Sequence, residues 1–215
     1  MKIAILFRGP IRPNPASVLA RVQEFMSQFS GAQVEIHTYL ATWRYWKGYK
    51  ASDLINLDLF DNVIMQTAPT EEHHRRCTAL THMKNGTRVE PVFNMYYQSK
   101  TALDIIVRND NYSYIVHNRT DLQMILGEHI NDWFDPNFYT APHVHPVHIM
   151  CDQFGIATGE NMHKAWDYGD IPNLGRMIEN ADIPERILEN MIDAAGIKVR
   201  APKHHIWQLD PSRNA

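Results

Sequence analysis

The amino-acid sequence predicts an α/β fold with a mostly parallel sheet flanked by helices. Short, continuous apolar runs such as residues 3–7 are typical of strands buried on both faces. Longer segments with helical periodicity, such as residues 15–29, separate these runs along the chain. Because strands and helices alternate at short spacing, we expect βαβ units with right-handed crossovers.

The individual elements follow from local patterns. Residues 3–7 end at Gly-Pro, and Pro15 favours a helix start after Asn14. Residues 42–50 are rich in aromatic and basic side chains, which indicates a loop or short helix, and polar residues 68–90 indicate a partly helical connection. Further strands are predicted at 34–39, 63–66, 114–117, 138–140 and 151–158, and further helices at 94–107, from about 161, and at 183–195.

Composition limits the classes of protein that fit. With 215 residues, 44% of them hydrophobic, the chain can bury a core as one domain over 1–215, and we find no repeat or linker that divides it. A net charge of -3 gives no basic face for nucleic acid. Cys77 and Cys151 share no metal or redox spacing, which favours a reducing, cytoplasmic location. The apolar N-terminal run is too short for a signal peptide or membrane span.

Ligands of open α/β sheets bind beyond the carboxyl ends of the strands, and the first candidate site lies there. Gly9 lets the backbone approach a ligand, and Arg8 and Arg12 can bind a phosphate through charge-assisted hydrogen bonds. The alternative is a tight turn with two solvated arginines. The pattern matches neither a dinucleotide fingerprint nor a P-loop.

Two aspartates follow later strand signals. Asp121, just after the 114–117 strand with Arg119 beside it, can hold a divalent cation that bridges a diphosphate, or it can cap a helix. Asp152 can act as a general base or second metal ligand, or it can pair with an arginine at a strand edge.

Histidines give a competing metal hypothesis. His143 and His145 share one face if the chain is extended there, and with His148 they suit zinc. Neighbouring prolines favour a loop instead, and no H-E-x-x-H or C-x-x-C partner is present.

Five motifs in one order resemble a group of bacterial and viral glycosyltransferases. They are KIAILFRGPIR at 2–12, VEIHTY at 34–39, NMYYQSK at 94–100, YIVHNRTDL at 114–122 and DQFGIATGENM at 152–162, so the resemblance spans residues 2 to about 166. It implies a single-domain, Rossmann-like GT-A fold that binds a nucleotide sugar. It also implies that residues 119–121 stand where such enzymes carry Asp-x-Asp, with Arg119 in place of the first carboxylate. An arginine there can neutralise diphosphate charge.

The resemblance implies transfer of a sugar from a nucleotide-diphosphate donor to a glycan or other hydroxyl. Mn²⁺ or Mg²⁺ would sit on Asp121, and Asp152 would be the base. Trp43, Trp46 and Tyr49 would stack on sugar rings or pack into the core. The donor-binding residues would be Arg8, Gly9, Arg12, His37 and Arg119.

Two other functions remain open. One is a metal-dependent hydrolase built on His143, His145 and His148, and the other is a non-catalytic nucleotide- or carbohydrate-binding module. The sequence names neither the oligomeric state nor the donor.

Overall fold

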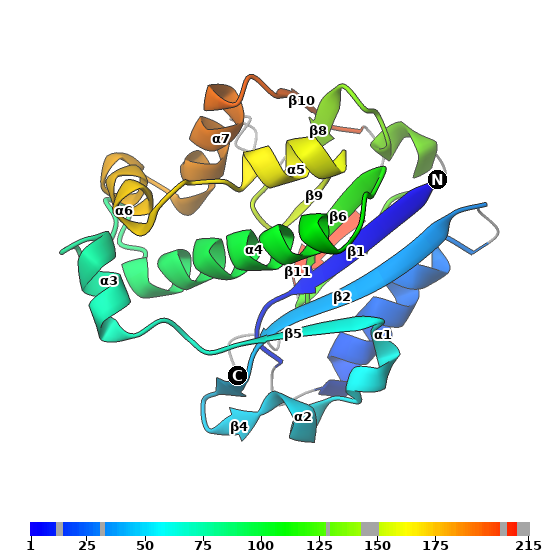
Figure 1. Ribbon diagram of the computed structural model, residues 1–215, viewed down its shortest axis with the longest axis horizontal. Coiled ribbons are helices and arrows are strands. Elements are labelled where there is room, and N and C mark those ends of the chain that lie inside the picture. The colour runs from blue at the N-terminus through cyan, green and yellow to red at the C-terminus, as the bar shows by residue number, and fades with distance from the viewer. Residues whose placement is uncertain (12–14, 31–32, 128–129, 143–150, 203–205, 210–215) are drawn as a thin grey trace.

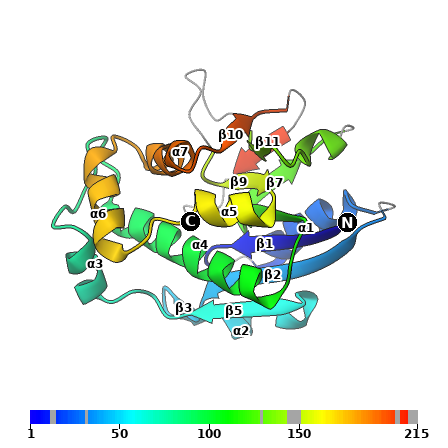
Figure 2. The same cartoon turned by 45° about the horizontal axis from the view of Figure 1, so that its top comes forward.

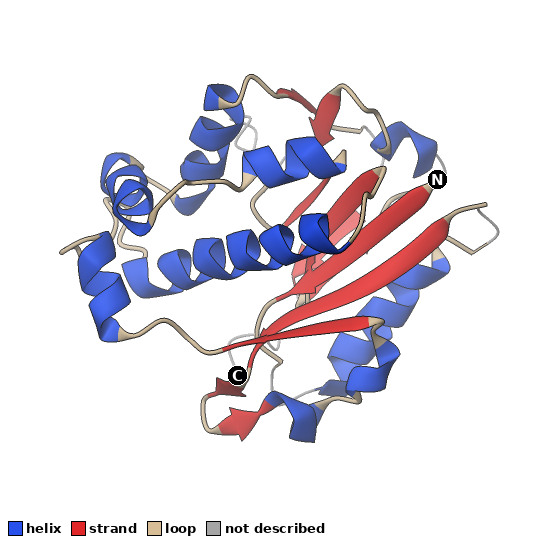
Figure 3. Cartoon of the chain, in the orientation of Figure 1, coloured by secondary structure: helices blue, strands red, loops and turns tan. Residues whose placement is uncertain are grey.

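A seven-stranded sheet forms the centre of the computed structural model (Figures 1 and 3). The structure describes residues 1–11, 15–30, 33–127, 130–142, 151–202 and 206–209. In spatial order the strands are β10 (Lys198–Arg200), β8 (Phe138–Thr140), β9 (Phe154–Ala157), β6 (Tyr114–Arg119), β1 (Lys2–Arg8), β2 (Glu35–Trp43) and β5 (Asn62–Gln66).

The sheet is parallel except at one strand. β1 pairs in parallel with both β2 and β6, β2 with β5, and β10 with β8, whereas β9 runs antiparallel to β6 and β8. The segment that leads into β9 therefore reaches the edge of the sheet at which β1 and β6 end. This reversal brings the residues before β9 to the same edge of the sheet as the end of the first strand.

Helices cover both faces of the sheet (Figures 1 and 2). On one face lie α4 (Val89–Asn109) and α5 (Gly159–Ala165), and on the other lies α1 (Pro15–Ser27), whose Phe25 packs edge-on against Phe7 of β1. Since both faces are covered, residues 3–7 of β1 are all buried. The remaining helices are α2 (Ala51–Leu54), α3 (Glu71–Cys77), α6 (Ile171–Asn180) and α7 (Pro184–Ala194), with 3₁₀ turns at Leu57–Leu59 and Ile130–Trp133.

Two small sheets complete the fold. β11 (Ile206–Leu209) pairs antiparallel with β7 (Leu122–Ile125), and β3 (Tyr45–Trp46) forms a hairpin with β4 (Tyr49–Lys50). The hairpin turn has positive φ angles at Lys47 (48°) and Gly48 (85°), as a tight two-residue turn requires. Residues 42–50 are thus the end of β2 and a hairpin, in place of the predicted loop or short helix.

No helix within the described residues has the length and the apolar character that crossing a membrane requires.

Candidate functional site

Three segments meet at the carboxyl edge of the central strands. Arg8 and Arg119 are register partners at the ends of β1 and β6. Phe154 at the start of β9 pairs with Asn118, so Asp152 lies just beyond the end of β6. The structure therefore brings together Arg8, Arg119 and Asp152, which come from three separate parts of the sequence.

Arg8 carries a buried positive charge; only 3% of the residue is exposed. Its Nε donates to Nε2 of His117 (2.8 Å), its Nη2 donates to the backbone oxygen of Asp152 (3.0 Å), and its guanidinium lies over the Trp166 ring. Burial, and then the charge of Arg119, lower the pKa of Arg8 to about 10, so the group stays charged at neutral pH. Among the described residues, no carboxylate forms an ion pair with it.

His117 fixes the position of Arg8. Because its Nε2 accepts from Arg8, the hydrogen-bond network assigns the ring proton to Nδ1 and the imidazole is neutral. Burial, followed by the charges of Arg8 and Arg119, lowers the pKa of His117 well below its usual value. The ring also packs on Trp166, with centroids 4.4 Å apart. The partnership of His117 with Arg8 could not be predicted from the sequence, because it depends on the pairing of two distant strands.

Arg119 and Asp121 form a bidentate ion pair. Nε and Nη2 of Arg119 donate to the two carboxylate oxygens of Asp121 at 2.8 and 2.7 Å. Burial lowers the pKa of Arg119, but the hydrogen bonds and charge of Asp121 outweigh it, and the pKa is raised. Asp121 leads into the strand β7, so its alternative interpretation as a helix N-cap is wrong.

Gly9 has a backbone that other residues rarely adopt. Its φ is +132°, its N–H donates to the oxygen of Ala41, and a Cβ at this position would lie 2.9 Å from Oγ1 of Thr120. The glycine thus lets β1 turn closely past the end of β6. Its predicted contact with a ligand stays a prediction. Arg12 lies outside the described residues.

His37 lies elsewhere. It pairs with Ala4, four residues before Arg8, which is about 13 Å along the strand. Its ring bonds the hydroxyl of Tyr112 (2.8 Å) and the carboxylate of Glu35 (3.1 Å) near the amino ends of the strands. The structure does not bring His37 to the carboxyl edge, which corrects its assignment to the donor site.

Asp152 is a buried carboxyl group at this edge. Burial raises its pKa, and the charges of Arg119 and Arg8 oppose that rise. Its backbone oxygen, rather than its carboxylate, accepts from Arg8, and its Oδ1 has no hydrogen-bond partner among the described residues. A carboxyl group with a raised pKa and an unpartnered oxygen suits proton transfer.

The donor set at this edge does not fit a divalent cation as it is arranged. Both oxygens of Asp121 already accept from a guanidinium. No group of three or more His, Cys, Asp and Glu within the described ranges could hold a metal ion. His143, His145 and His148 lie outside those ranges, so the hydrolase hypothesis stays open.

The aromatic residues of the 42–50 segment are divided. Trp43 is only 4% exposed and belongs to the interior, whereas Tyr49 is 48% exposed on the hairpin. Of the two predicted roles, Trp43 therefore takes the packing role. Stacking on a sugar stays a prediction for Tyr49.

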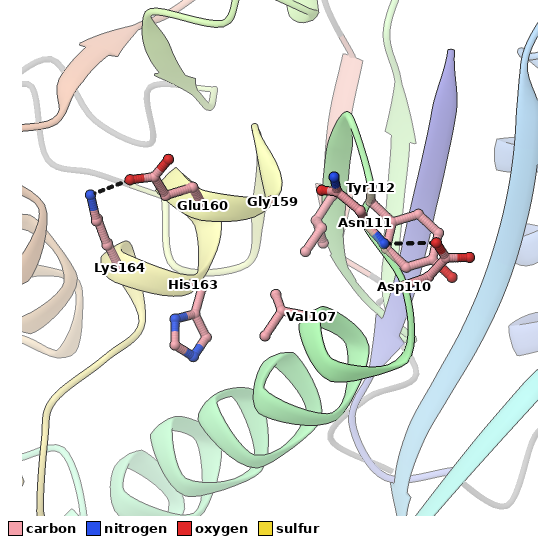
Figure 4. A pocket seen from close by; sticks show the side chains of 9 residues that line it. Val107, Asp110, Asn111, Tyr112, Gly159, Glu160, His163 and Lys164 are labelled. Carbon is pink, nitrogen blue, oxygen red and sulfur yellow. Dashed lines mark hydrogen bonds and ion pairs between the residues drawn. The ribbon is translucent and has the colours of Figure 1, made fainter.

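A separate pocket of about 180 Å³ opens at the opposite, amino edge of the sheet. Figure 4 shows Val107 of α4 and His163 of α5 facing it, with Asp110 and Tyr112 on the loop before β6. Its ionic side chains are paired: Lys164 with Glu160, Asp110 with Lys2, and His163 with Asp104. None of the residues that line it belongs to the carboxyl-edge site.

Comparisons with known proteins concern the fold. No protein-family model and no curated protein sequence matches the chain. Among solved structures it is similar to the catalytic domain of Drosophila β1,4-galactosyltransferase 7 in complex with xylobiose, at 13% identity and a TM-score of 0.45. A mutant of the same enzyme in complex with manganese, UDP-Gal and xylobiose gives 12% identity and the same TM-score. Each alignment covers 94% of this chain and 65% of the other. The fold of this chain is α/β, with a central seven-stranded sheet flanked by helices.

Proposed function

We propose that the protein transfers a sugar from a nucleoside-diphosphate donor to a hydroxyl of a glycan or similar acceptor, in the cytoplasm, as a single domain over residues 1–215. The observation that carries the proposal is Arg8: a charged guanidinium buried at the carboxyl edge and held by neutral groups. The charges of Asp152 and Asp121 act on Arg8 from nearby, but neither carboxylate forms an ion pair with it. Burying a charge without a hydrogen-bonded opposite charge is costly, and such costs are concentrated at binding sites. A diphosphate supplies a negative group that can accept directly from Arg8.

In this reaction the basic residues bind the donor and Asp152 acts on the acceptor. Arg8, with Gly9 and Arg12, binds the nucleotide diphosphate, and Arg119 adds positive charge to it. As the bond between the anomeric carbon and the diphosphate oxygen breaks, negative charge grows on the diphosphate, and fixed guanidinium groups stabilise it. The acceptor oxygen forms the new bond to the anomeric carbon, and its proton passes to the carboxylate of Asp152.

A thermal-shift screen tests this function. UDP, GDP, ADP, CDP and dTDP are each added at millimolar concentration, with and without Mn²⁺. A nucleotide at 100 times its Kd should stabilise the protein by about 2.7 kcal/mol, and for a chain of this size each kcal/mol raises the Tm by about 2–4 °C. Arg8→Gln should abolish the shift, and Arg108→Gln, an exposed arginine at the end of α4, should retain it.

The outcomes separate the hypotheses. No shift with any nucleotide would contradict a transferase. A shift without turnover of the matching nucleotide sugar would favour the non-catalytic binding module. Zinc bound stoichiometrically after reconstitution, and lost in a His143→Ala, His145→Ala double variant, would favour the hydrolase.

A further inference from the structure

We infer that this site binds the diphosphate without a divalent cation, and that the Arg119–Asp121 ion pair stands in the place of a metal bound to a carboxylate. The inference rests on the proposed function and specifies how that site neutralises its ligand. It departs from the sequence-based prediction of Mn²⁺ or Mg²⁺ on Asp121.

The geometry of the ion pair is the first reason. The guanidinium plane presents two parallel N–H groups to the two oxygens of Asp121, and the Asp121 side chain is only 5% exposed. A cation coordinated by those oxygens would lie within a few ångströms of the guanidinium charge, and the two positive charges would repel each other. Arg119 therefore takes the position in which the carboxylate would otherwise hold a metal.

The donors that remain on Arg119 are the second reason. A guanidinium has five N–H groups, and Asp121 accepts from Nε and from one hydrogen of Nη2. The others point away from the carboxylate, and the Arg119 side chain is partly exposed. Planar N–H pairs match the oxygens of a phosphate. Asp121 is thus a positioning residue that holds this donor surface in one orientation.

A second fixed positive charge lies beside the first. Arg8 and Arg119 are register partners on adjacent parallel strands. Burial, and then the nearby charge of Arg119, lower the pKa of Arg8. Two like charges are held close together by His117 on one side and Asp121 on the other. A ligand with two adjacent phosphates relieves this repulsion without a metal ion.

Calorimetry on the full chain tests the inference. The nucleoside diphosphate that gives the largest thermal shift is titrated once in EDTA and once in Mn²⁺. We expect the two Kd values to agree closely. A Kd that is about tenfold or more higher in EDTA than in Mn²⁺ would overturn the inference and leave the proposed function intact. Absence of binding in both buffers would overturn the proposed function, and the inference with it.

Three variants sharpen the test. Arg119→Gln should weaken binding in EDTA by about tenfold or more, since a charge-assisted bond to phosphate is lost. Asp121→Asn, which keeps one acceptor oxygen, should weaken it less and equally in both buffers. Arg108→Gln is the control and should change neither Kd. If Asp121→Asn weakens binding in Mn²⁺ alone, the carboxylate binds the metal and the inference is wrong.

Electron paramagnetic resonance gives a direct readout of metal binding to the wild-type chain. Mn²⁺ is titrated into the wild-type chain without nucleotide. Free Mn²⁺ should remain fully visible in the spectrum. Stoichiometric loss of that signal, reversed by Asp121→Asn, would show a metal site on Asp121 and overturn the inference.

Discussion

Burial shifts the pKa values of Arg8 and Asp152, two buried residues of the candidate site, in opposite directions. It lowers the pKa of Arg8 and raises that of Asp152, so each neutral form is favoured. Arg8 keeps its charge at neutral pH because its usual pKa is so high. Asp152 starts from a low pKa, and the rise brings it toward the range in which a carboxylate can exchange a proton with an acceptor hydroxyl.

Asp152→Asn should separate stability from turnover. Turnover should fall by about 10²–10⁴-fold if the carboxylate is the base, while the Kd of the donor nucleotide stays nearly unchanged. The Tm at neutral pH should rise, because the variant no longer buries a group that resists ionisation. Initial rates with the donor sugar and a thermal melt measure the two effects.

The dependence of protein stability on pH tests the raised pKa of Asp152. A carboxyl group whose pKa is raised in the folded state binds its proton more tightly there than in the unfolded chain. Its favourable contribution is therefore complete below the unfolded pKa and is lost as the pH rises through the folded one. As the pH rises from the unfolded pKa of the Asp152 carboxyl group through its folded pKa, the free energy of unfolding of the wild type should fall relative to that of Asp152→Asn. Asp53→Asn, at an exposed position in α2, is the control and should show no such difference. A variant that melts earlier and turns over normally would make Asp152 a structural residue.

At the level of elements, the sequence predicts best what local patterns encode. The apolar runs at 3–7 and 114–117 are the adjacent strands β1 and β6, and the segment 94–107 lies within α4. The predicted strand at 151–158 begins later, at Phe154, because Asp152 turns toward the site before pairing starts.

Elements that depend on distant partners could not be predicted in the same way. β7 is a strand because β11, more than 80 residues later in the sequence, pairs with it. Local sequence patterns do not report a partner that far away. The predicted elements do not include the helix α6, although Asp170 caps it and Pro172 lies in its first turn. In the candidate site, local patterns predict that Arg8, Arg119 and Asp152 lie near strand ends, and the structure places them there. The partnerships of Arg8 with His117 and of Arg119 with Asp121 depend on side-chain geometry, which those patterns do not encode.

Gly175 shows where two helices pack too closely for any side chain. A Cβ at this position in α6 would lie 1.5 Å from the backbone oxygen of Cys77 at the end of α3. Gly175→Ala should therefore destabilise the protein by about 1–3 kcal/mol or more. Without the contact, the same change inside a helix would stabilise it by up to about 1 kcal/mol. Urea unfolding measures the difference, and its sign decides the outcome.

Arg176→Ala is the matched control in the same helix. Arg176 is exposed, and we expect a change within about 0.5 kcal/mol. A Gly175→Ala variant as stable as this control would mean that α3 and α6 do not pack as the structure shows.

At the scale of the whole molecule, the two edges of the sheet differ in chemistry. The carboxyl edge holds buried charges, Arg8 and Asp152 among them, whereas the amino edge has a pocket whose ionic side chains pair with one another. The chain carries a net charge of -3, so an anionic ligand gains nothing from the overall charge and depends on the local arginines.

Hydrogen exchange with and without the nucleoside diphosphate should therefore change at one edge only. Ligands of open α/β sheets bind where the parallel strands end, and a bound ligand slows the local opening through which amides exchange. Peptides that cover residues 8–11, 117–121 and 151–153 should gain protection when the nucleotide is added. Peptides from the amino-edge pocket, residues 107–112 and 159–164, are the internal control and should exchange at an unchanged rate.

In Arg8→Gln the protection at the carboxyl edge should disappear while exchange in the pocket stays the same. Protection confined to the pocket would place the nucleotide at the amino edge, beside His37 and Tyr112, and would contradict the proposed site.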